Sequence, residues 1–425
     1  MQALELSEDF KYVLDLLEKT NASIFVTGRA GTGKSTLLQL FRNTTRKRAV
    51  VLAPTGIAAL NVQGQTIHSF FRFPAKLLTA KDVGRRRDRR LYQHMEVMII
   101  DEISMVRADL LDHIDRFLRI NRDHQLPFGG VQVVFFGDLF QLPPVVANDI
   151  ERNIFSTYYD SPYFFSAKVF EQFEVDKIEL RKVYRQEARY FIRLLDAVRT
   201  NRLDQDDLMD LNERYLPNFE SEDFYITLSA RNSTVDRINK RELEHIPMPV
   251  HRYFANIKGN FAPKLFPTEQ ILQLKLNAQV MFIRNDPDRQ FVNGTIGKIV
   301  KLEQEEITVM LETQDGRRKY VEVKQIEWEI MRYKMGENAK IKSEVIGTFT
   351  QYPLRLAWAI TIHKSQGKTF DKVIIDLGKG AFEHGQTYVA LSRCRTLEGI
   401  VLRHPLRWSD VKTDERIVDY YEQYF

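Results

Sequence analysis

Short apolar runs recur along the first part of the chain, and each ends in a polar or glycine-bearing stretch. They lie at residues 24–27, 49–52, 97–100 and 131–136, and apolar residues at helical spacing precede them over 10–17. Continuous apolar strands that alternate with helical segments are typical of a parallel sheet covered on both faces. The pattern predicts a first α/β domain that ends near Leu180.

A second set of apolar runs predicts a second parallel core. These runs lie at residues 225–228, 280–283, 357–362, 373–375 and 400–402. Between about residues 298 and 346 the pattern changes to alternation, with an Asp315-Gly316 turn between two runs, which predicts a small β-barrel inserted in the second core. A length of 425 residues also exceeds what one hydrophobic core supports, so we expect two to four domains.

Composition narrows the class of protein only slightly. Lys and Arg total 62 against 57 for Asp and Glu, a formal charge of +5 that leans toward a polyanionic partner. The single cysteine, Cys394, excludes an internal disulfide and a multi-cysteine metal site, and favours a reducing compartment. No run of 18 apolar residues occurs and the first ten residues lack an apolar core, so we expect a soluble intracellular protein without a membrane span.

The strongest chemical signal is the segment 28–35, Gly28-Arg-Ala-Gly-Thr-Gly-Lys-Ser35. It fits the phosphate-binding pattern G-x-x-x-x-G-K-[ST] in full and lies between a predicted strand and a predicted helix. Its glycines let backbone N–H groups face phosphates, Lys34 reaches the β and γ oxygens, and the Ser35 hydroxyl ligates Mg²⁺. The alternative is an ordinary flexible glycine turn.

A second nucleotide motif follows the apolar run 97–100, which ends in Asp101-Glu102. Asp101 would hold Mg²⁺, and Glu102 would orient or deprotonate the attacking water. A solvated acidic strand end is the alternative for this pair. Gln141, in a loop after the run 131–136, carries both a donor and an acceptor and suits a γ-phosphate sensor, although a plain Pro-Pro loop remains the alternative.

Two arginines from the second core are candidates for stabilising charge across a cleft. Arg185 lies in Tyr184-Arg-Gln186 and Arg393 follows Ser392. An arginine that reaches a transferring phosphoryl group raises the rate by roughly 10³ to 10⁵. Judged from the residues alone, an ordinary surface position is favoured for both.

Taken in order, seven segments resemble the motifs of superfamily 1 helicases, in the 5′-to-3′ branch that contains RecD and the PIF (petite integration frequency) helicases. The segments are GRAGTGKST, APTGIAAL with TIHSFF, DEISM, FGGVQVVFFGDLFQLPPV, YRQ, TIHKSQGKTF and YVALSRCRT. The stretch 112–145 looks like the PIF helicases rather than RecD. The compact length suggests a bacterial member.

The resemblance implies an α/β fold with two RecA-like P-loop motor domains, a small wedge insertion in the first and an SH3-like β-barrel insertion in the second. We expect the first domain at 1–63 and 75–181, the wedge at 64–74, the second domain at 182–297 and 347–425, and the β insertion at 298–346.

The resemblance also implies the nucleotide-site residues. Catalytic roles fall to Lys34, Glu102, Gln141, Arg185 and Arg393, and Mg²⁺ binding to Ser35 and Asp101. Residues expected to contact ATP are Gly28, Ala30, Gly31, Thr32, Gly33, Lys34, Ser35, Thr36 and Gly367. Family members often place a glutamine that reads adenine shortly after the first Leu-Ser; here Phe10 stands there and Gln2 is the only glutamine upstream.

The family's strand-contacting segments match one set of residues in each half of the chain. The expected DNA contacts are Pro54, Thr55, Gly56, Thr66, His68, Ser69, Phe71, Thr361, His363 and Lys364. Short hydroxyls, backbone amides and rings suit a track for single strands that is indifferent to sequence. His68 and His363 share a Thr-x-His frame, although a lone histidine is more often a core or surface residue.

Two neighbouring features stay open between roles. Phe70 is favoured as a core residue, whereas Phe71 and Phe73 could belong to the core or to a duplex-splitting wedge. The arginine-rich run 85–90 could be a solvated face or a grip on duplex phosphates.

The sequence thus predicts an ATP-hydrolysing, Mg²⁺-dependent DNA helicase that moves 5′ to 3′ on single-stranded DNA. The resemblance implies action on forks, displacement loops, RNA–DNA hybrids and G-quadruplexes in DNA repair and recombination. We expect a monomer in solution, in the bacterial cytoplasm with the nucleoid or in the nucleus of a eukaryote. The alternatives are a translocase that strips proteins from DNA and a P-loop ATP switch used in complex assembly.

Overall fold

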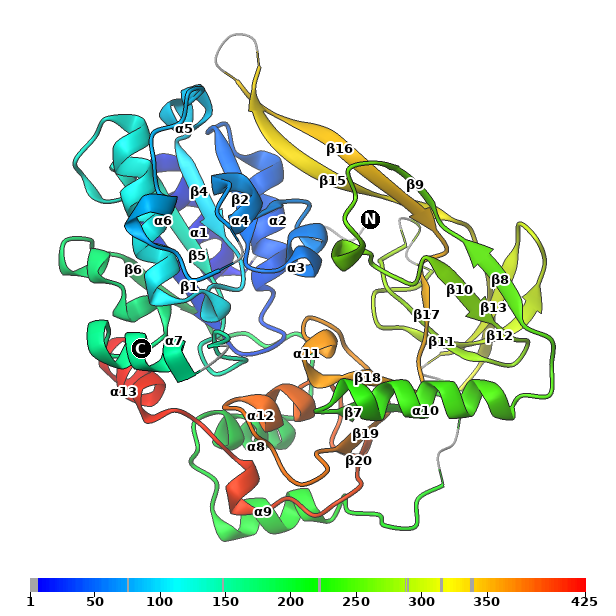
Figure 1. The fold of residues 1–425 in the computed structure, drawn as a ribbon. Coiled ribbons are helices and arrows are strands. Elements are labelled where there is room, and N and C mark those ends of the chain that lie inside the picture. The colour runs from blue at the N-terminus through cyan, green and yellow to red at the C-terminus, as the bar shows by residue number, and fades with distance from the viewer. Residues whose placement is uncertain are drawn as a thin grey trace.

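The protein is described by a computed structural model that covers residues 7–74, 76–146, 149–220, 223–286, 288, 290–313, 316–336 and 340–425. Two α/β regions lie side by side, and a β-rich region projects from the second (Figure 1). No helix within these ranges is long and apolar enough to cross a membrane.

The first α/β region is built on a six-stranded sheet in the order β3-β2-β4-β5-β1-β6. Its strands are β1 Ile24–Gly28, β2 Ala49–Ala53, β3 Gln65–Thr66, β4 Val97–Ile100, β5 Gln132–Phe136 and β6 Asp176–Leu180. Every pairing is parallel, and β1, β4 and β5 are buried along their whole length because helices cover both faces. The four apolar runs of the first predicted core are therefore confirmed as strands.

Helices flank this sheet: α1 Glu8–Lys19, α2 Lys34–Thr44, α3 Gly56–Asn61, α4 Ile67–Phe71, α5 Arg90–His94, α6 Ala108–Arg122 and α7 Asp149–Tyr158. In α1 the Ser7 side chain accepts from the Phe10 N–H and caps the helix. Phe10, Val13 and Leu17 then share one face and are buried, as their spacing predicts.

Within the range expected for the wedge, 64–74, β3 belongs to this sheet and α4 follows it directly. Gln65 and Thr66 pair with the end of β2, and Phe70, Phe71 and Phe73 are all buried in the same aromatic cluster. Aromatic residues followed by a polar loop look alike in a wedge and at a sheet edge, so the sequence could not separate the two. Phe70 is a core residue, as favoured.

The second α/β region has a four-stranded parallel sheet in the order β18-β7-β19-β20. Its elements are β7 Ile226–Ser229, β18 Ala359–Thr361, β19 Val373–Asp376, β20 Ile400–Leu402, α8 Arg189–Arg199, α9 Gln205–Asn212, α10 Asn232–His245, α11 Ile362–Ser365 and α12 Gln386–Leu391. The apolar run 280–283, predicted for this core, lies elsewhere: β11 Gln279–Phe282 pairs antiparallel with β12 and β17 of the insertion. This strand is buried along its whole length, so its apolar composition does not distinguish a strand of the second core from a strand of the insertion.

The insertion is larger than the predicted 298–346 and consists of three antiparallel sheets. Its strands are β8 His251–Phe254, β9 Asn256–Gly259, β10 Ile271–Leu274, β11, β12 Ile296–Leu302, β13 Ile307–Glu312, β14 Arg318–Val323, β15 Ile326–Met335, β16 Ile341–Gln351 and β17 Leu354–Leu356. The alternating runs are confirmed as β12, β13 and β14. The expected turn residue Asp315 lies outside the described residues.

A long arm formed by β15 and β16 extends from the insertion to the first sheet (Figure 1). The Tyr333 hydroxyl accepts a hydrogen bond from the Val51 N–H at 3.0 Å, and the Tyr333 N–H donates to the Gln65 side chain at 3.2 Å. The insertion, which interrupts the second α/β region, therefore also contacts the first.

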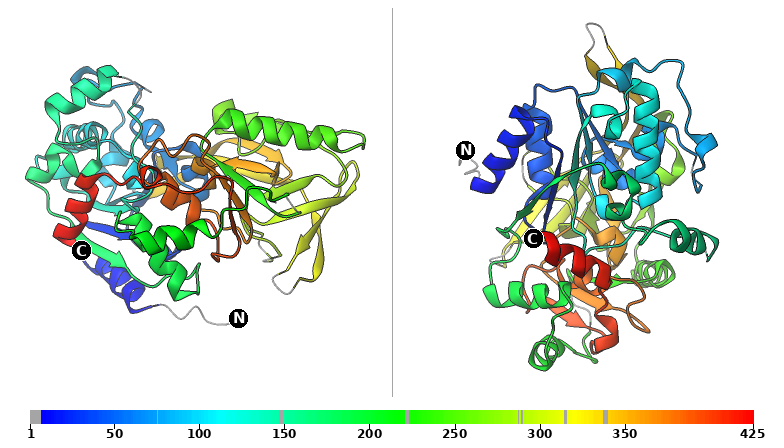
Figure 2. Two further views of the ribbon diagram at one scale, coloured as in Figure 1. Left: turned by 90° about the horizontal axis from the view of Figure 1, so that it is seen from below. Right: turned by 90° about the vertical axis from the view of Figure 1, so that its left-hand side faces the viewer.

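The last helix, α13 Glu415–Tyr424, packs against the first region (Figure 2). The Tyr421 hydroxyl donates to Glu179 on β6 at 2.6 Å, and Phe425 contacts Phe25 of β1 edge to face. The expected second domain, 182–297 with 347–425, thus differs from the structure at its C-terminal helix. The chain crosses between the two α/β regions twice.

Short 3₁₀ helices complete the described structure: η1 Ala80–Asp82, η2 Ile103–Met105, η3 Pro127–Gly130, η4 Phe164–Ser166, η5 Lys168–Glu171, η6 Pro263–Leu265 and η8 Trp408–Asp410.

Candidate nucleotide cleft and strand path

The glycine-rich loop joins the end of β1 to the start of α2. Gly31 and Gly33 both have φ of +87°, a conformation that favours glycine. A Cβ on Gly31 would lie 2.5 Å from the Cβ of Arg185, and one on Gly33 would lie 2.8 Å from the Phe10 ring. The loop therefore needs glycine both for its left-handed backbone and for its close packing. It leads into the N-terminus of α2, whose backbone N–H groups form an anion-binding site.

Lys34 lies inside this loop and bonds to its carbonyls. Its Nζ donates to Gly28 O at 2.6 Å and to Arg29 O at 3.0 Å. Burial lowers the pKa of Lys34, and the carboxylates of Asp138 and Glu102 oppose that shift. A buried ammonium that faces a phosphate cradle is well placed to bind phosphate oxygens.

Asp101 and Glu102 follow β4 and form a buried acidic pair. Burial, and then the neighbouring charge of Glu102, raise the pKa of Asp101 to about 7. Burial also raises the pKa of Glu102, whereas Lys34 and Arg393 oppose the rise. Carboxylates and a hydroxyl are the hard oxygen ligands that Mg²⁺ prefers, and Ser35 and Glu102 line the same cleft, so the residues present fit that ion.

These groups open onto one cleft between the two α/β regions. Its lining residues are Ala30, Gly31, Gly33, Lys34, Ser35, Thr36, Glu102, Gln141, Tyr184, Arg185, Gly367, Thr369, Arg393 and Arg395. Most of the expected ATP contacts are in this set. Gly28, Thr32 and Asp101 do not line the cleft; Thr32 and Asp101 are buried, and the Thr32 hydroxyl donates to Arg29 O within the loop.

Arg185 and Arg393 reach the cleft from the second region, next to each other. Arg393 donates from Nε to Val389 O at 2.9 Å, and Arg185 donates to Ser392 O at 3.1 Å. Burial lowers the pKa of Arg393 to about 10, and burial followed by the charge of Arg393 lowers the pKa of Arg185 strongly. Two desolvated cations side by side favour binding of an anion between them and the loop.

Gln141 bridges the two regions directly. Its Nε2 donates to Asp138 at 3.1 Å, and its Oε1 accepts from Gln366 Nε2 at 3.0 Å. The sequence analysis missed Gln366 and Asp138, although both lie inside quoted motifs. The contacts of these two side chains form only in the folded cleft. The one signal in the sequence was that Gln366 precedes Gly367 and that Asp138 lies three residues before Gln141.

The two Thr-x-His frames adopt the same local structure. Thr66 ends β3 and caps α4, and Thr361 ends β18 and caps α11; each hydroxyl accepts a backbone N–H three residues on, at 3.3 and 3.2 Å. A strand end followed by a capped helical turn exposes backbone N–H groups, which suits contacts with phosphates.

The surroundings of the two histidines differ. Burial lowers the pKa of His68, and the nearby cations Arg107 and Lys264 lower it further. His363 instead faces Glu383, with 3.0 Å between Nε2 and a carboxylate oxygen. Lys264 belongs to η6, which lies between β9 and β10 of the insertion, so the first frame feels the charge of the insertion.

The first-domain contacts expected for DNA are partly covered. A Cβ on Gly56 would lie 2.1 Å from the Leu265 side chain of η6, while Thr55 caps α3 by accepting from the Ala58 N–H. The Ser69 hydroxyl accepts from Gln65. Phe71 is 0% exposed, so in this structure its ring offers no face to a base.

A groove between α3, the insertion and the second region lies next to these residues. It is lined by Ile57, Leu60, Asn61, Pro267, Met281, Ile283, Trp328, Arg355, Ile360, Lys364 and Lys368. Lys364 is the expected DNA contact within it. Trp328, Arg355 and Lys368 also line it and were not singled out from the sequence. Trp328 and Arg355 come from segments without a motif, whereas Lys368 lies inside the quoted segment TIHKSQGKTF.

The arginine run 85–90 is largely engaged within the protein. Arg85 and Arg89 pair with Asp123 at the end of α6, and Arg90 pairs with Asp88. Arg86 donates to Phe71 O at 2.8 Å and lies over the Phe117 ring. These contacts fasten the loop before α5 to α6, which favours a structural role for the run.

Phe10 packs beneath the glycine loop, with its ring at Gly33 and edge to face with Tyr184. It presents a ring, and no hydrogen-bonding side-chain group, near the nucleotide cleft. Gln2 lies outside the described residues.

Comparison with known proteins adds independent observations. The sequence profile of the family described as PIF1-like helicase matches residues 5–208. The ATP-dependent DNA helicase PIF1 of Homo sapiens is 34% identical over 98% of this chain and 63% of its own length. The ATP-dependent DNA helicase Pif1 of Bdellovibrio bacteriovorus is 32% identical over 99% of this chain and 92% of its own length. The chain thus spans less than two thirds of the human relative.

Crystal structures of a Bacteroides sp. Pif1 are also similar to this chain. Its complex with ADP-AlF4 superimposes with a TM-score of 0.91 at 40% identity, covering 99% of this chain and 97% of the other. The form bound to single-stranded DNA gives a TM-score of 0.69 at the same identity and coverage. Since both crystals hold Bacteroides Pif1, the lower score reflects a different arrangement of its parts.

Proposed function

The chain belongs to the PIF1-like helicase family, and on that basis we propose that it is an ATP-dependent DNA helicase that moves 5′ to 3′ on single-stranded DNA. The observation that carries the proposal is the cleft itself. Lys34 and Glu102 of one α/β region face Arg185 and Arg393 of the other across it. A nucleotide between them links the two regions, so hydrolysis changes how they sit together.

The proposed chemistry divides among these residues. Loop N–H groups and Lys34 bind the β- and γ-phosphates, and Ser35 and Asp101 would hold Mg²⁺, which when bound neutralises phosphate charge. Glu102 accepts a proton from the attacking water. Arg393 and Arg185 stabilise charge on the transferred group. Gln141 contacts the γ-phosphate and couples it to the second region through the hydrogen bond that its Oε1 accepts from Gln366 Nε2 at 3.0 Å.

The strand path is proposed along the two Thr-x-His frames and the groove that contains Lys364. Capped helix starts in both regions offer N–H groups to phosphates, and Trp328 and Arg355 add a ring and a cation to the groove. The crystal of Bacteroides Pif1 bound to single-stranded DNA, and a Pif1 structure described as the basis for unwinding at forked double-stranded DNA, support this class of partner.

The finer parts of the proposal follow from the same family. They include action on forks, RNA–DNA hybrids and G-quadruplexes, roles in DNA repair and recombination, a monomeric state, and a location with the nucleoid or in the nucleus. A translocase that separates strands poorly is the second candidate, because Phe70, Phe71 and Phe73 form core and not an exposed wedge.

The test measures ATP hydrolysis with and without single-stranded DNA, alongside unwinding of duplexes with a 5′ or a 3′ tail. We expect strong stimulation by DNA, its loss in Lys34→Ala, and opening of the 5′-tailed duplex alone. Stimulation without unwinding would favour the translocase. A rate that DNA does not change would contradict both motors and leave the P-loop switch.

A further inference from the structure

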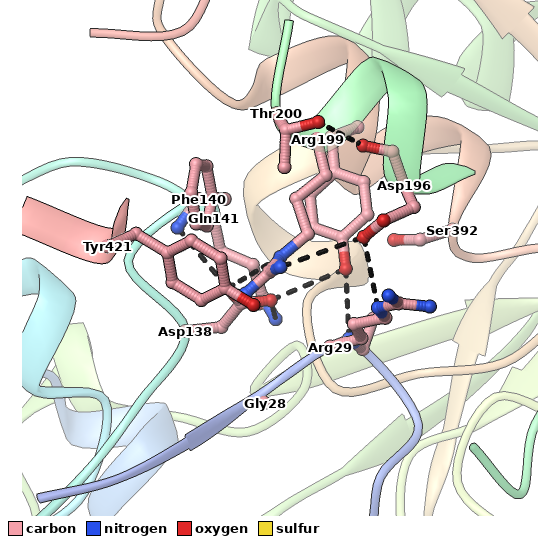
Figure 3. Close-up of polar contacts among 12 residues, drawn as sticks. Gly28, Arg29, Asp138, Phe140, Gln141, Asp196, Arg199, Thr200, Ser392 and Tyr421 are labelled. Atoms are coloured by element: carbon pink, nitrogen blue, oxygen red, sulfur yellow. Dashed lines mark hydrogen bonds and ion pairs between the residues drawn. The ribbon is translucent and has the colours of Figure 1, made fainter. Parts of the chain in front are cut away.

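One arginine with no assigned role lies fully buried where three parts of the chain meet (Figure 3). Arg199 ends α8 and is 1% exposed. Its guanidinium lies over the Phe140 ring at 4.2 Å and the Tyr421 ring at 4.8 Å. Phe140 follows β5 and Tyr421 belongs to α13, so this side chain from α8 contacts two elements that pack in the first region.

Three carboxylates surround this guanidinium at similar distances. Asp138 lies 3.5 Å away, Asp196 3.7 Å and Glu179 3.9 Å. Burial by itself would lower the pKa of Arg199, but Asp138, Tyr388 and Tyr421 together outweigh it and the pKa is raised. The cation is therefore held by a ring of acids and not by one short pair.

Asp138 is shared between Arg199 and the nucleotide cleft. It accepts from Gln141 Nε2 at 3.1 Å and from the Tyr388 hydroxyl at 3.4 Å. The Tyr388 hydroxyl in turn accepts from the N–H of Ala30 in the glycine loop at 2.9 Å. Gln141, Asp138 and the loop are thus joined through two side chains of the second region, Arg199 and Tyr388.

A second route leads from α8 to the same loop. Arg29 pairs with Asp196 at 3.0 Å, and Asp196 lies one helical turn before Arg199 (Figure 3). Arg199 does not line the nucleotide cleft; it lines a small cavity behind the loop with Arg29, Ala30 and Tyr388. It therefore acts on the cleft through other residues.

We propose that Arg199 is a positioning residue that fixes Asp138 relative to α8 and α13. Through Asp138 it also fixes Gln141 and the glycine loop, so that binding of a nucleotide in the cleft moves the second region. This inference rests on the proposed motor function and names the buried connection by which the motor would work.

The choice of arginine at position 199 favours a positioning role over a contribution to folding stability alone. Replacing a buried ion pair by apolar residues is often neutral or stabilising, so stability alone does not call for a buried arginine. A planar guanidinium can stack between two rings while it faces several acids, and a lysine ammonium cannot. The contacts of Arg199 join the second region to the first at Asp138, which also accepts a hydrogen bond from Gln141, the proposed γ-phosphate sensor.

The central experiment compares Arg199→Lys with wild type in three measurements: basal ATP hydrolysis, hydrolysis at saturating single-stranded DNA, and base pairs opened per ATP consumed. We expect the KM for ATP to change little, whereas the DNA-stimulated kcat and the pairs opened per ATP fall roughly tenfold, the scale for loosened positioning. Arg193→Lys is the matched control, because Arg193 lies on the same helix and pairs with Asp207 at its exposed face.

Asp138→Asn keeps the shape and removes the shared charge. If the two residues act as one unit, the Asp138→Asn, Arg199→Lys double variant is no worse than either single variant. Additive losses, equal losses in the Arg193 control, or a parallel fall of basal and stimulated rates would overturn the inference and leave a structural role.

A readout that does not need DNA separates this inference from the motor function. Asn43→Cys and Lys240→Cys place dyes on exposed positions of the two regions, and the native Cys394 is buried. We expect ADP with aluminium fluoride to change energy transfer, and Arg199→Lys to lose most of that change. A full response in the variant overturns the inference, whereas a wild-type ATPase that DNA does not stimulate contradicts only the motor function.

Discussion

The nucleotide cleft and the strand path differ in how completely this structure assembles them. In the cleft, Lys34, Glu102, Arg185 and Arg393 already line one space. On the strand path, Leu265 of the insertion covers Gly56 in the first region, while Lys364 opens onto a groove in the second. The difference teaches that the two proposed sites are separable: the residues of the cleft come from the two α/β regions, whereas the proposed strand path also involves the insertion.

The arm formed by β15 and β16 explains why the insertion lies over the first region. Tyr333 bonds to Val51 and Gln65, which anchors the arm at the edge of the first sheet. The comparison of cleft and path therefore predicts different outcomes for variants on each side.

The largest effect is expected in the cleft. Arg393→Ala should lower kcat for ATP about 10³-fold at saturating single-stranded DNA, because a desolvated cation facing the transferred phosphate is lost. Binding of single-stranded DNA should stay near the wild-type value. Arg202→Ala is the control, since that arginine forms an exposed pair with Glu422. A loss below about threefold in Arg393→Ala would remove it from the catalytic set.

A smaller effect of opposite sign is expected on the strand path. Leu265→Ala removes the side chain that lies against Gly56, and should tighten binding of single-stranded DNA roughly tenfold if the insertion competes with the strand. Fluorescence anisotropy of a labelled oligonucleotide measures the effect, with basal ATP hydrolysis followed in parallel. Phe254→Ala, at an exposed position of the same insertion, is the control. Unchanged or weaker binding in Leu265→Ala would show that the cover is not a barrier.

Base selectivity sharpens the picture of the cleft. Phe10 supplies a ring and no hydrogen-bonding group, so kcat/KM for ATP and GTP should differ by less than about tenfold in the wild type. Phe10→Gln should raise the preference for ATP several-fold, and Phe10→Leu should leave the ratio unchanged. Strong preference for ATP in the wild type would mean that another group reads adenine.

The smallest effect concerns the buried acid pair. The unfolded Asp101 carboxyl titrates near 3.8 and the folded one at about 7, so between those values the unfolded chain loses a proton that the folded chain keeps. Stability therefore falls as pH rises through this window, and Asp101→Asn removes that loss. Without Mg²⁺ or nucleotide, the variant should be more stable than wild type at pH 8 by about 1 kcal/mol, or roughly 2–4 °C in Tm.

Differential scanning calorimetry at pH 8 and at pH 4 tests the sign. The difference between Asp101→Asn and wild type should be much smaller at pH 4, which is close to the unfolded pKa of 3.8, than at pH 8, and it should shrink at pH 8 when Mg²⁺ is added. Equal Tm values at both pH values would contradict a raised pKa.

Much of the fold was readable from local pattern. The first core's apolar runs became β1, β2, β4 and β5, and the alternating runs became β12 to β14, because burial on two faces or one leaves a distinct period. The run 280–283 was placed in the wrong sheet, since a strand buried on both faces looks the same in a motor core and in an insertion. The phenylalanines at 70–73 were ambiguous for a similar reason.

The motifs alone named the chemistry of the site, because a phosphate loop, an acidic strand end and a Thr-x-His frame each need particular residues close together in the chain. The tertiary structure determined the contacts between residues that lie far apart in the sequence. It set Arg185 and Arg393 opposite Lys34, returned α13 to the first region, laid Leu265 on Gly56, and buried Arg199 against Asp138. These contacts join residues far apart in sequence, and their partners are chosen by packing and by the low dielectric of the interior.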